Sequence, residues 1–115
     1  MSEPEKETRV YNNGRWELWS LSGKRQSMAG SILREAAELV DGERHEAYGD
    51  SHANMAHTAA VWSAYLGVTV TPEDVAWMLG MAKACRAKKG AYHPDNYRDA
   101  AGYAAIAGDM AGDKR

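Results

Sequence analysis

The sequence predicts an all-α protein, a compact four-helix bundle-like domain with a short N-terminal β-hairpin or extended arm. Four segments carry apolar residues at helical spacing, and each ends at or just before a glycine. The hydrophobic residues also suit close helix packing, because the 115-residue chain is rich in Ala, has six Met and four Trp, and lacks Phe. We divide the chain into a polar tail with the hairpin arm, residues 1–26, and an α-helical domain, residues 27–111.

The arm is predicted from a tight-turn signal near the N-terminus. Asn13 and Gly14 stand between two stretches of aromatic and branched residues, which is typical of a β-hairpin. Because an isolated hairpin is marginally stable in water, Trp16 and Trp19 need a surface to cover. We therefore expect the arm to pack on the helices or on a partner subunit.

The helices are delimited by their caps and stops. The strongest start is Thr71-Pro72, with Thr at the cap, Pro at the first position and acidic residues in the first turn. The second helix is apolar on two sides, which indicates a place in a core or at an interface between subunits. The expected helices run over residues 27–40, 51–66, 72–88 and 94–111.

Composition argues against several classes of protein. The net charge of −2 gives no general attraction for nucleic acid, so direct nucleic-acid binding is not expected. No apolar run approaches the roughly 20 residues that cross a bilayer, and the acidic N-terminus is unlike a signal peptide. We therefore expect a cytoplasmic protein that forms a homo-oligomer. Cys85, the single cysteine, is expected on the core stripe of the third helix.

The last helix carries the most distinctive pattern in the chain. At about 100° per residue, one stripe of this helix holds two acidic and three apolar residues, namely Asp95, Asp99, Tyr103, Ile106 and Met110. The three apolar residues belong in a core. Two carboxylates in line with them must be solvated in a cleft, paired with cations or bound to a metal ion.

A second acidic pair, Glu35 and Glu38, lies on the first helix. If the two helices face each other, four carboxylates would form an octahedral oxygen site of the kind that Mg²⁺ or Mn²⁺ prefers. The metal ligands would then be Glu35, Glu38, Asp95 and Asp99. The alternative is that the glutamates form a solvated helix face, while Asp95 serves the helix dipole and Asp99 pairs with a basic residue of the third helix.

Basic, polar and aromatic residues elsewhere in the chain suit a phosphorylated ligand. Lys83 and Arg86 could grip phosphate oxygens, or they could complement the helix dipole and pair with Asp99. His93 could cap the last helix or contact a ligand, and Tyr48 could supply a stacking ring or belong to an ordinary turn. The candidate ligand-binding residues are Tyr48, Asn54, Lys83, Arg86, His93 and Asn96.

From Ile32 to Met110 the chain resembles a family of small uncharacterised proteins found in bacteriophages and prophages. The resemblance is carried by the E-A-A helix at 35–37, R-x-x-x-Y-G at 44–49, an Asn at 54, W-S-A-Y-L-G at 62–67, T-P-x-D-V-A at 71–76, K-x-x-R at 83–86 and H-x-D-x-x-x-D-x-A-G-Y-A at 93–104. It covers the larger part of the chain. It implies a phage-encoded protein that is located in the host cytoplasm.

The E-x-x-E helix followed by an acidic helix is also similar to the all-α nucleotide pyrophosphatases of the MazG type. Those proteins are oligomeric helical bundles in which carboxylates hold Mg²⁺, and they cleave a nucleoside triphosphate to the monophosphate and pyrophosphate. Their usual pattern is E-E-x-x-E and then E-x-x-D. This chain has Arg34 in place of the first Glu and D-x-x-x-D at residues 95–99.

The MazG similarity implies a protein that acts on nucleotides. Glu38 and Asp99 would be catalytic, Mg²⁺ or Mn²⁺ would activate a water for in-line attack, and Lys83 and Arg86 would neutralise phosphate charge. Two other hypotheses stay open, so the sequence does not decide whether the protein is an enzyme. One is a nucleotide-binding module without chemistry, which would sequester a signalling nucleotide. The other is a structural or interaction protein whose aspartates pair with Lys83 and Arg86.

Overall fold

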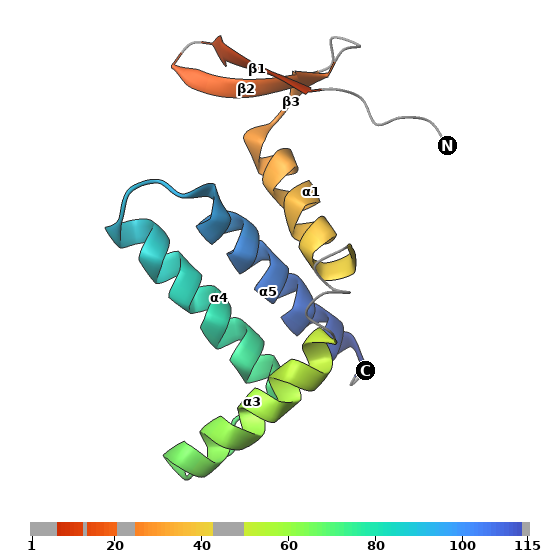
Figure 1. Ribbon diagram of the computed structural model, residues 1–115, viewed down its shortest axis with the longest axis vertical. Coiled ribbons are helices and arrows are strands. Elements are labelled where there is room, and N and C mark those ends of the chain that lie inside the picture. Colours follow the sequence, from red (N-terminus) through yellow and green to blue (C-terminus); the bar gives the residue numbers. More distant parts are fainter. Residues whose placement is uncertain (1–6, 13, 21–24, 43–49, 114–115) are drawn as a thin grey trace.

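The computed structural model (Figure 1) describes residues 7–12, 14–20, 25–42 and 50–113. The strands are β1 Glu7–Asn12, β2 Arg15–Ser20 and β3 Arg25–Gln26, and the helices are α1 Met28–Asp41, α3 Ser51–Leu66, α4 Pro72–Lys89 and α5 Pro94–Asp113. The predicted all-α, bundle-like domain with an N-terminal hairpin is therefore confirmed. None of the helices in this part of the chain is both long enough and apolar enough to span a membrane.

The arm is a hairpin extended by a third short strand. β1 and β2 pair antiparallel, with Asn12 opposite Arg15, and Gly14 adopts a φ of +79° that favours glycine. β2 also pairs with β3, which the sequence did not predict. The sheet lies at the N-terminal end of α1 (Figure 1). The side chains of Trp16 and Trp19 lie outside what the structure describes, so the surface that they cover stays a prediction.

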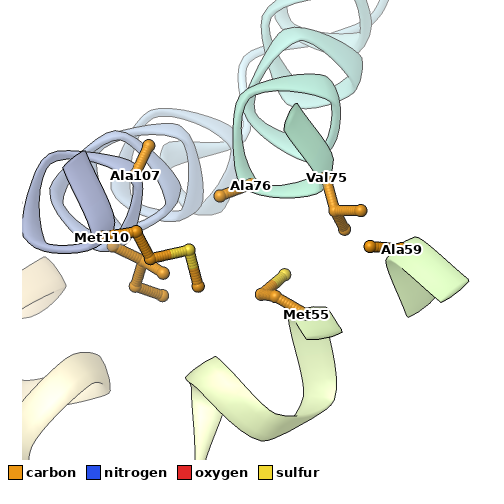
Figure 2. Packing of buried hydrophobic residues seen from close by; sticks show 7 residues of the cluster. Met55, Ala59, Val75, Ala76, Ala107 and Met110 are labelled. Carbon is orange, nitrogen blue, oxygen red and sulfur yellow. The ribbon is translucent and has the colours of Figure 1, made fainter. Parts of the chain in front are cut away.

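Helices α4 and α5 lie side by side and antiparallel, and they form the frame of the domain (Figure 1). Small residues set their separation. A Cβ atom added at Gly80 would stand 3.4 Å from Tyr103 Cβ, and Ala76 and Ala107 are fully buried in the core (Figure 2). Because these positions carry little or no side chain, the two helices can approach each other closely.

The other two helices pack on this frame at different places. Met55 and Ala59 of α3 join the main core, which contains Met55, Ala59, Val75, Ala76, Ile106, Ala107 and Met110 (Figure 2). His52 Nε2 at the start of α3 lies 2.9 Å from Asp109 Oδ2 and ties α3 to α5. Helix α1 packs on α5 near Gly102, where an added Cβ atom would stand 3.9 Å from Val40 Cγ2.

Helix α4 buries only part of the apolar stripe that its spacing predicts, which consists of Val75, Met78, Leu79, Ala82 and Cys85. Cys85 was expected in the core but is exposed, and Met78 and Met81 expose 39% and 57% of their surface. Val75 of the predicted stripe is fully buried, and Leu79 packs partly buried against the core, but Ala76 from outside the stripe is fully buried as well. The prediction for Cys85 was wrong because α4 is apolar on most of its circumference, so the spacing of apolar residues does not select one face.

The link between α3 and α4 is held by side-chain hydrogen bonds to the backbone. Ser63 Oγ accepts from the Val70 N–H at 2.8 Å and donates to the Val70 carbonyl at 3.1 Å. Thr71 and Asp74 form a capping box, in which each side chain accepts from the backbone N–H of the other, at 3.1 Å and 2.9 Å. These bonds fix the direction in which α3 crosses the end of α4.

We expect Thr71→Ala to lower the free energy of unfolding by about 1 kcal/mol, because the Asp74 N–H in the first turn of α4 loses its cap. Urea denaturation followed by circular dichroism measures the change. Thr69→Ala is the control, since Thr69 is exposed in the same link, and its unfolding midpoint should match that of the unaltered protein. Equal losses in the two variants would show that the cap is not responsible.

Candidate functional site

One pocket gathers most of the residues that the sequence singles out. It has a volume of about 310 Å³ and lies between the C-terminal half of α4 and the first turns of α5. Its lining consists of Lys83, Arg86, His93, Asp95, Asn96 and Asp99. The structure thus brings together four predicted ligand-binding residues and the two predicted metal-binding aspartates. We call this the α4–α5 pocket.

Asp99 lies between two basic side chains. Lys83 Nζ is 3.1 Å from Asp99 Oδ2, and Arg98 Nε donates to Asp99 Oδ1 at 3.1 Å. The three side chains expose only 18–23% of their surface, so solvent screens these pairs less than it would on an open surface. Arg98 Nη1 also lies 3.5 Å from Oδ1 of the exposed Asp95. Of the three environments that the sequence allowed for Asp99, the structure shows pairing with cations.

Arg86 brings an unpaired positive charge to the pocket. Its guanidinium forms no ion pair with any residue that the structure describes, whereas Lys83 is engaged by Asp99. Arg86 lies in the last turn of α4, where the helix dipole favours a cation. A guanidinium presents a planar fork that binds phosphate or carboxylate with two parallel hydrogen bonds. Among the described residues, no carboxylate pairs with Arg86, so its guanidinium is open to an anionic ligand.

Asn96 is the buried polar residue of the pocket. It exposes 9% of its surface, and its backbone N–H donates to the His93 carbonyl at 3.1 Å. Its side-chain amide makes no hydrogen bond within the described residues. Burying an amide without a hydrogen-bond partner costs about 1–3 kcal/mol of folding free energy, and buried polar groups in proteins rarely lack such a partner. The amide is therefore available to a ligand that enters the pocket.

The four predicted metal-binding carboxylates do not come together in one chain. Glu35 and Glu38 are exposed on α1, which packs on the Gly102 side of α5, whereas Asp99 is turned toward Lys83 on α4. Among the described residues, no three His, Cys, Asp or Glu side chains lie close enough to hold a metal ion. Within the described residues the two acidic pairs lie apart, because α5 presents different sides to α1 and to α4, and a metal site built from all four carboxylates stays a prediction.

The remaining predicted residues lie elsewhere. Asn54 is exposed on α3 and does not line the α4–α5 pocket. Tyr48 falls outside the described residues, so its role stays a prediction.

Arg98 was missed by the sequence analysis. It contacts both Asp95 and Asp99, and its spacing of three residues from Asp95 on one helix was the available signal.

A larger pocket of about 540 Å³ lies toward the other end of α5. The described residues of its lining include three aspartates and no Lys or Arg, and they are Val40, Asp41, Asp50, Ser51, His52, Ala105, Ile106 and Asp109. Its acidic character does not suit a phosphorylated ligand. The smaller pocket is therefore the better candidate for the chemistry that the sequence indicates.

In a comparison with known protein families, residues 31–111 match the family described as "Domain of unknown function (DUF6378)". The chain is 44% identical over 77 residues to the "Gene 55 protein" of Mycobacterium phage L5, a match that covers 66% of the chain and 49% of that protein. It is 40% identical over 77 residues to the "Gene 55 protein" of Mycobacterium phage D29, covering 67% and 51%. The chain thus spans about half the length of these curated relatives. No solved structure matches it.

We expect Asp99→Ala to lower the free energy of unfolding by about 1–3 kcal/mol, because Lys83 and Arg98 would lose the carboxylate that compensates them in a largely buried setting. Asp95→Ala is the matched control, since Asp95 exposes 69% of its side chain, and its effect should stay below about 0.5 kcal/mol. Chemical denaturation of both variants measures the difference. Losses of similar size would mean that the Lys83–Asp99 pair contributes no more than an exposed one.

Proposed function

The chain belongs to the DUF6378 family, and we propose that it is a phage-encoded protein that binds a nucleotide or another phosphorylated small molecule in the α4–α5 pocket. One observation carries the proposal. The same pocket contains the guanidinium of Arg86 and the buried side-chain amide of Asn96, and neither group pairs with any residue that the structure describes. The dipole of α4 favours a cation at Arg86, but no contact among the described residues explains the buried Asn96 amide, and a ligand with a phosphate and a polar edge would satisfy both groups.

The phosphate would bind on the α4 side of the pocket. Arg86 would hold its oxygens as a fork, and Lys83 would add a point charge from its place beside Asp99. His93, which precedes the first turn of α5, would supply one more hydrogen bond. A pocket of about 310 Å³ is at the small end of the range for small-molecule sites. It therefore suits a mononucleotide better than a larger ligand.

We propose binding without hydrolysis. The MazG resemblance implies Mg²⁺ held by carboxylates, but the described carboxylates do not fit such a site, because Asp99 is paired with Lys83 and Arg98 while Glu35 and Glu38 lie apart on α1. A nucleotide-sequestering module needs the basic and amide groups and no metal. A purely structural role would explain the Lys83–Asp99 ion pair, but it would not explain why the Asn96 amide is buried.

We also propose that the protein is a homo-oligomer whose copies meet through the outer face of α4. Trp77, Met78 and Met81 lie on this face and expose 47%, 39% and 57% of their surface, and Cys85 beside them is exposed as well. A run of large apolar side chains on the surface of a small domain is typical of a contact with another protein. Most soluble oligomers are built from identical copies, so a second copy of this chain is the proposed partner.

The binding function predicts the ³¹P spectrum of a nucleotide mixture. Addition of the protein should broaden and shift the phosphate signals without creating new ones, and EDTA should change nothing, because binding uses Arg86 and Lys83 rather than a metal. Arg86→Gln should remove most of the broadening. Lys89→Gln is the matched control, because Lys89 is an exposed cation in the same turn but does not line the pocket.

Two outcomes would contradict this prediction. Loss of triphosphate signals that depends on Mg²⁺ or Mn²⁺, with new monophosphate and pyrophosphate signals, would establish the hydrolase instead. Spectra that the protein leaves unchanged would refute nucleotide binding at the α4–α5 pocket.

We expect Met81→Glu to reduce the mass of the particle measured by light scattering after gel filtration, because a charge in the middle of an apolar contact cannot be solvated. Leu33→Glu is the control, since Leu33 is also an exposed apolar residue, at 62%, but lies on α1. A particle whose mass is unchanged by Met81→Glu, or that is a monomer from the start, would exclude the α4 face as the contact.

A further inference from the structure

Asn96 differs from every other residue of the α4–α5 pocket in being both polar and buried. It is the buried polar residue of the described chain, with 9% of its surface exposed, whereas the basic and acidic groups around it are partly or largely exposed. Its backbone N–H is bonded to the His93 carbonyl, so the first turn of α5 fixes its position before any ligand arrives. A group held in this way is preorganised for binding.

The chemistry of a carboxamide limits what can satisfy it. The Asn96 side chain presents a carbonyl acceptor beside an NH₂ donor. A phosphate group at neutral pH offers mainly acceptors, so it can pair with the NH₂ group but leaves the carbonyl oxygen without a donor. Full pairing requires a ligand edge on which a donor stands beside an acceptor. The bases of nucleotides carry such edges, and the N6/N7 edge of adenine matches an Asn side chain in two hydrogen bonds.

We infer that Asn96 determines specificity in this pocket and that its ligand is a nucleotide whose base is bound by the Asn96 amide while Arg86 binds the phosphate. Both residues line the same pocket of about 310 Å³, from α5 and α4 respectively. The neighbouring aspartates do not compete for the base, because Arg98 and Lys83 engage them. The inference rests on the proposed phosphate-binding function and adds the class of ligand to it.

The first test measures the melting temperature of the ligand-free protein. Asn96→Leu removes a buried amide that has no partner in the part of the chain that the structure describes, so the melting temperature should rise by about 5 °C. Asn96→Ala is the control for a poor fit of the Leu side chain, because Ala removes the amide without adding volume. The melting temperature of this variant should not fall below that of the unaltered protein. A fall in both variants would overturn the inference, because it would show that the amide stabilises the free protein.

The second test compares ligands by isothermal titration calorimetry. The ligands are the four ribonucleoside monophosphates, ribose 5-phosphate, which lacks a base, and inorganic phosphate. The unaltered protein should bind at least one nucleotide, with AMP expected to be tightest, about 100-fold more tightly than ribose 5-phosphate. In Asn96→Leu and Asn96→Ala this preference should fall to about threefold or less, while the affinity for ribose 5-phosphate stays the same. Tyr97→Ala, which changes an exposed neighbour in the same turn, should keep the preference.

The outcomes separate this inference from the function on which it rests. Equal affinities of the unaltered protein for nucleotides and ribose 5-phosphate would overturn base recognition and leave phosphate binding intact. A preference that survives both substitutions of Asn96 would assign base recognition to another residue. Binding of none of these ligands would refute the proposed function itself.

Discussion

The close approach of α4 and α5 is the constraint on which the rest of the structure depends. Gly80 lets the backbone of α4 approach Tyr103 of α5, and the small, fully buried side chains of Ala76 and Ala107 keep the distance between the two helices short. Larger side chains at these positions would force the helices apart. The separation that results places Lys83 within 3.1 Å of Asp99 and leaves the pocket at the end of the pair where Asn96 is buried.

The described carboxylates at the site pair with Lys83 and Arg98 and not with Arg86. Asp99 accepts from Arg98 and pairs with Lys83, and Arg98 also reaches Asp95. These contacts hold Lys83 in place while Arg86 remains unengaged by the described residues. A network of this kind positions groups more than it stabilises the fold, because desolvation of the charges offsets most of their attraction. The charged contacts around Asp99 are therefore better understood as positioning side chains at the α4–α5 pocket than as a source of stability.

Sequence reasoning was accurate where a single local interaction decides the structure. The caps at Thr71 and at the other helix starts, and the Asn-Gly turn of the hairpin, located the elements closely. It failed where the answer depends on which face of a helix meets which neighbour. Cys85 was placed inside because α4 is apolar on most sides, and the two acidic pairs were joined because nothing local shows that α5 presents different sides to α1 and α4. The residues that line the α4–α5 pocket had been singled out as candidate ligand or metal contacts and lie close together in the sequence, and their roles stay predictions. The burial of Asn96 could not be foreseen, since it depends on packing between helices. The division of the chain after residue 26 stays a prediction.

Helix α3 crosses the α4–α5 pair at one end (Figure 1), whereas the lining of the α4–α5 pocket lies toward the other end. This separation has a consequence for how the protein tolerates change. Met55 and Ala59 of α3 share no described contact with Arg86 or Asn96. Substitutions at two such separated places combine additively in free energy. Substitutions can therefore accumulate at the α3 end over evolutionary time without disturbing the α4–α5 pocket, and substitutions in the pocket can accumulate without disturbing the α3 end.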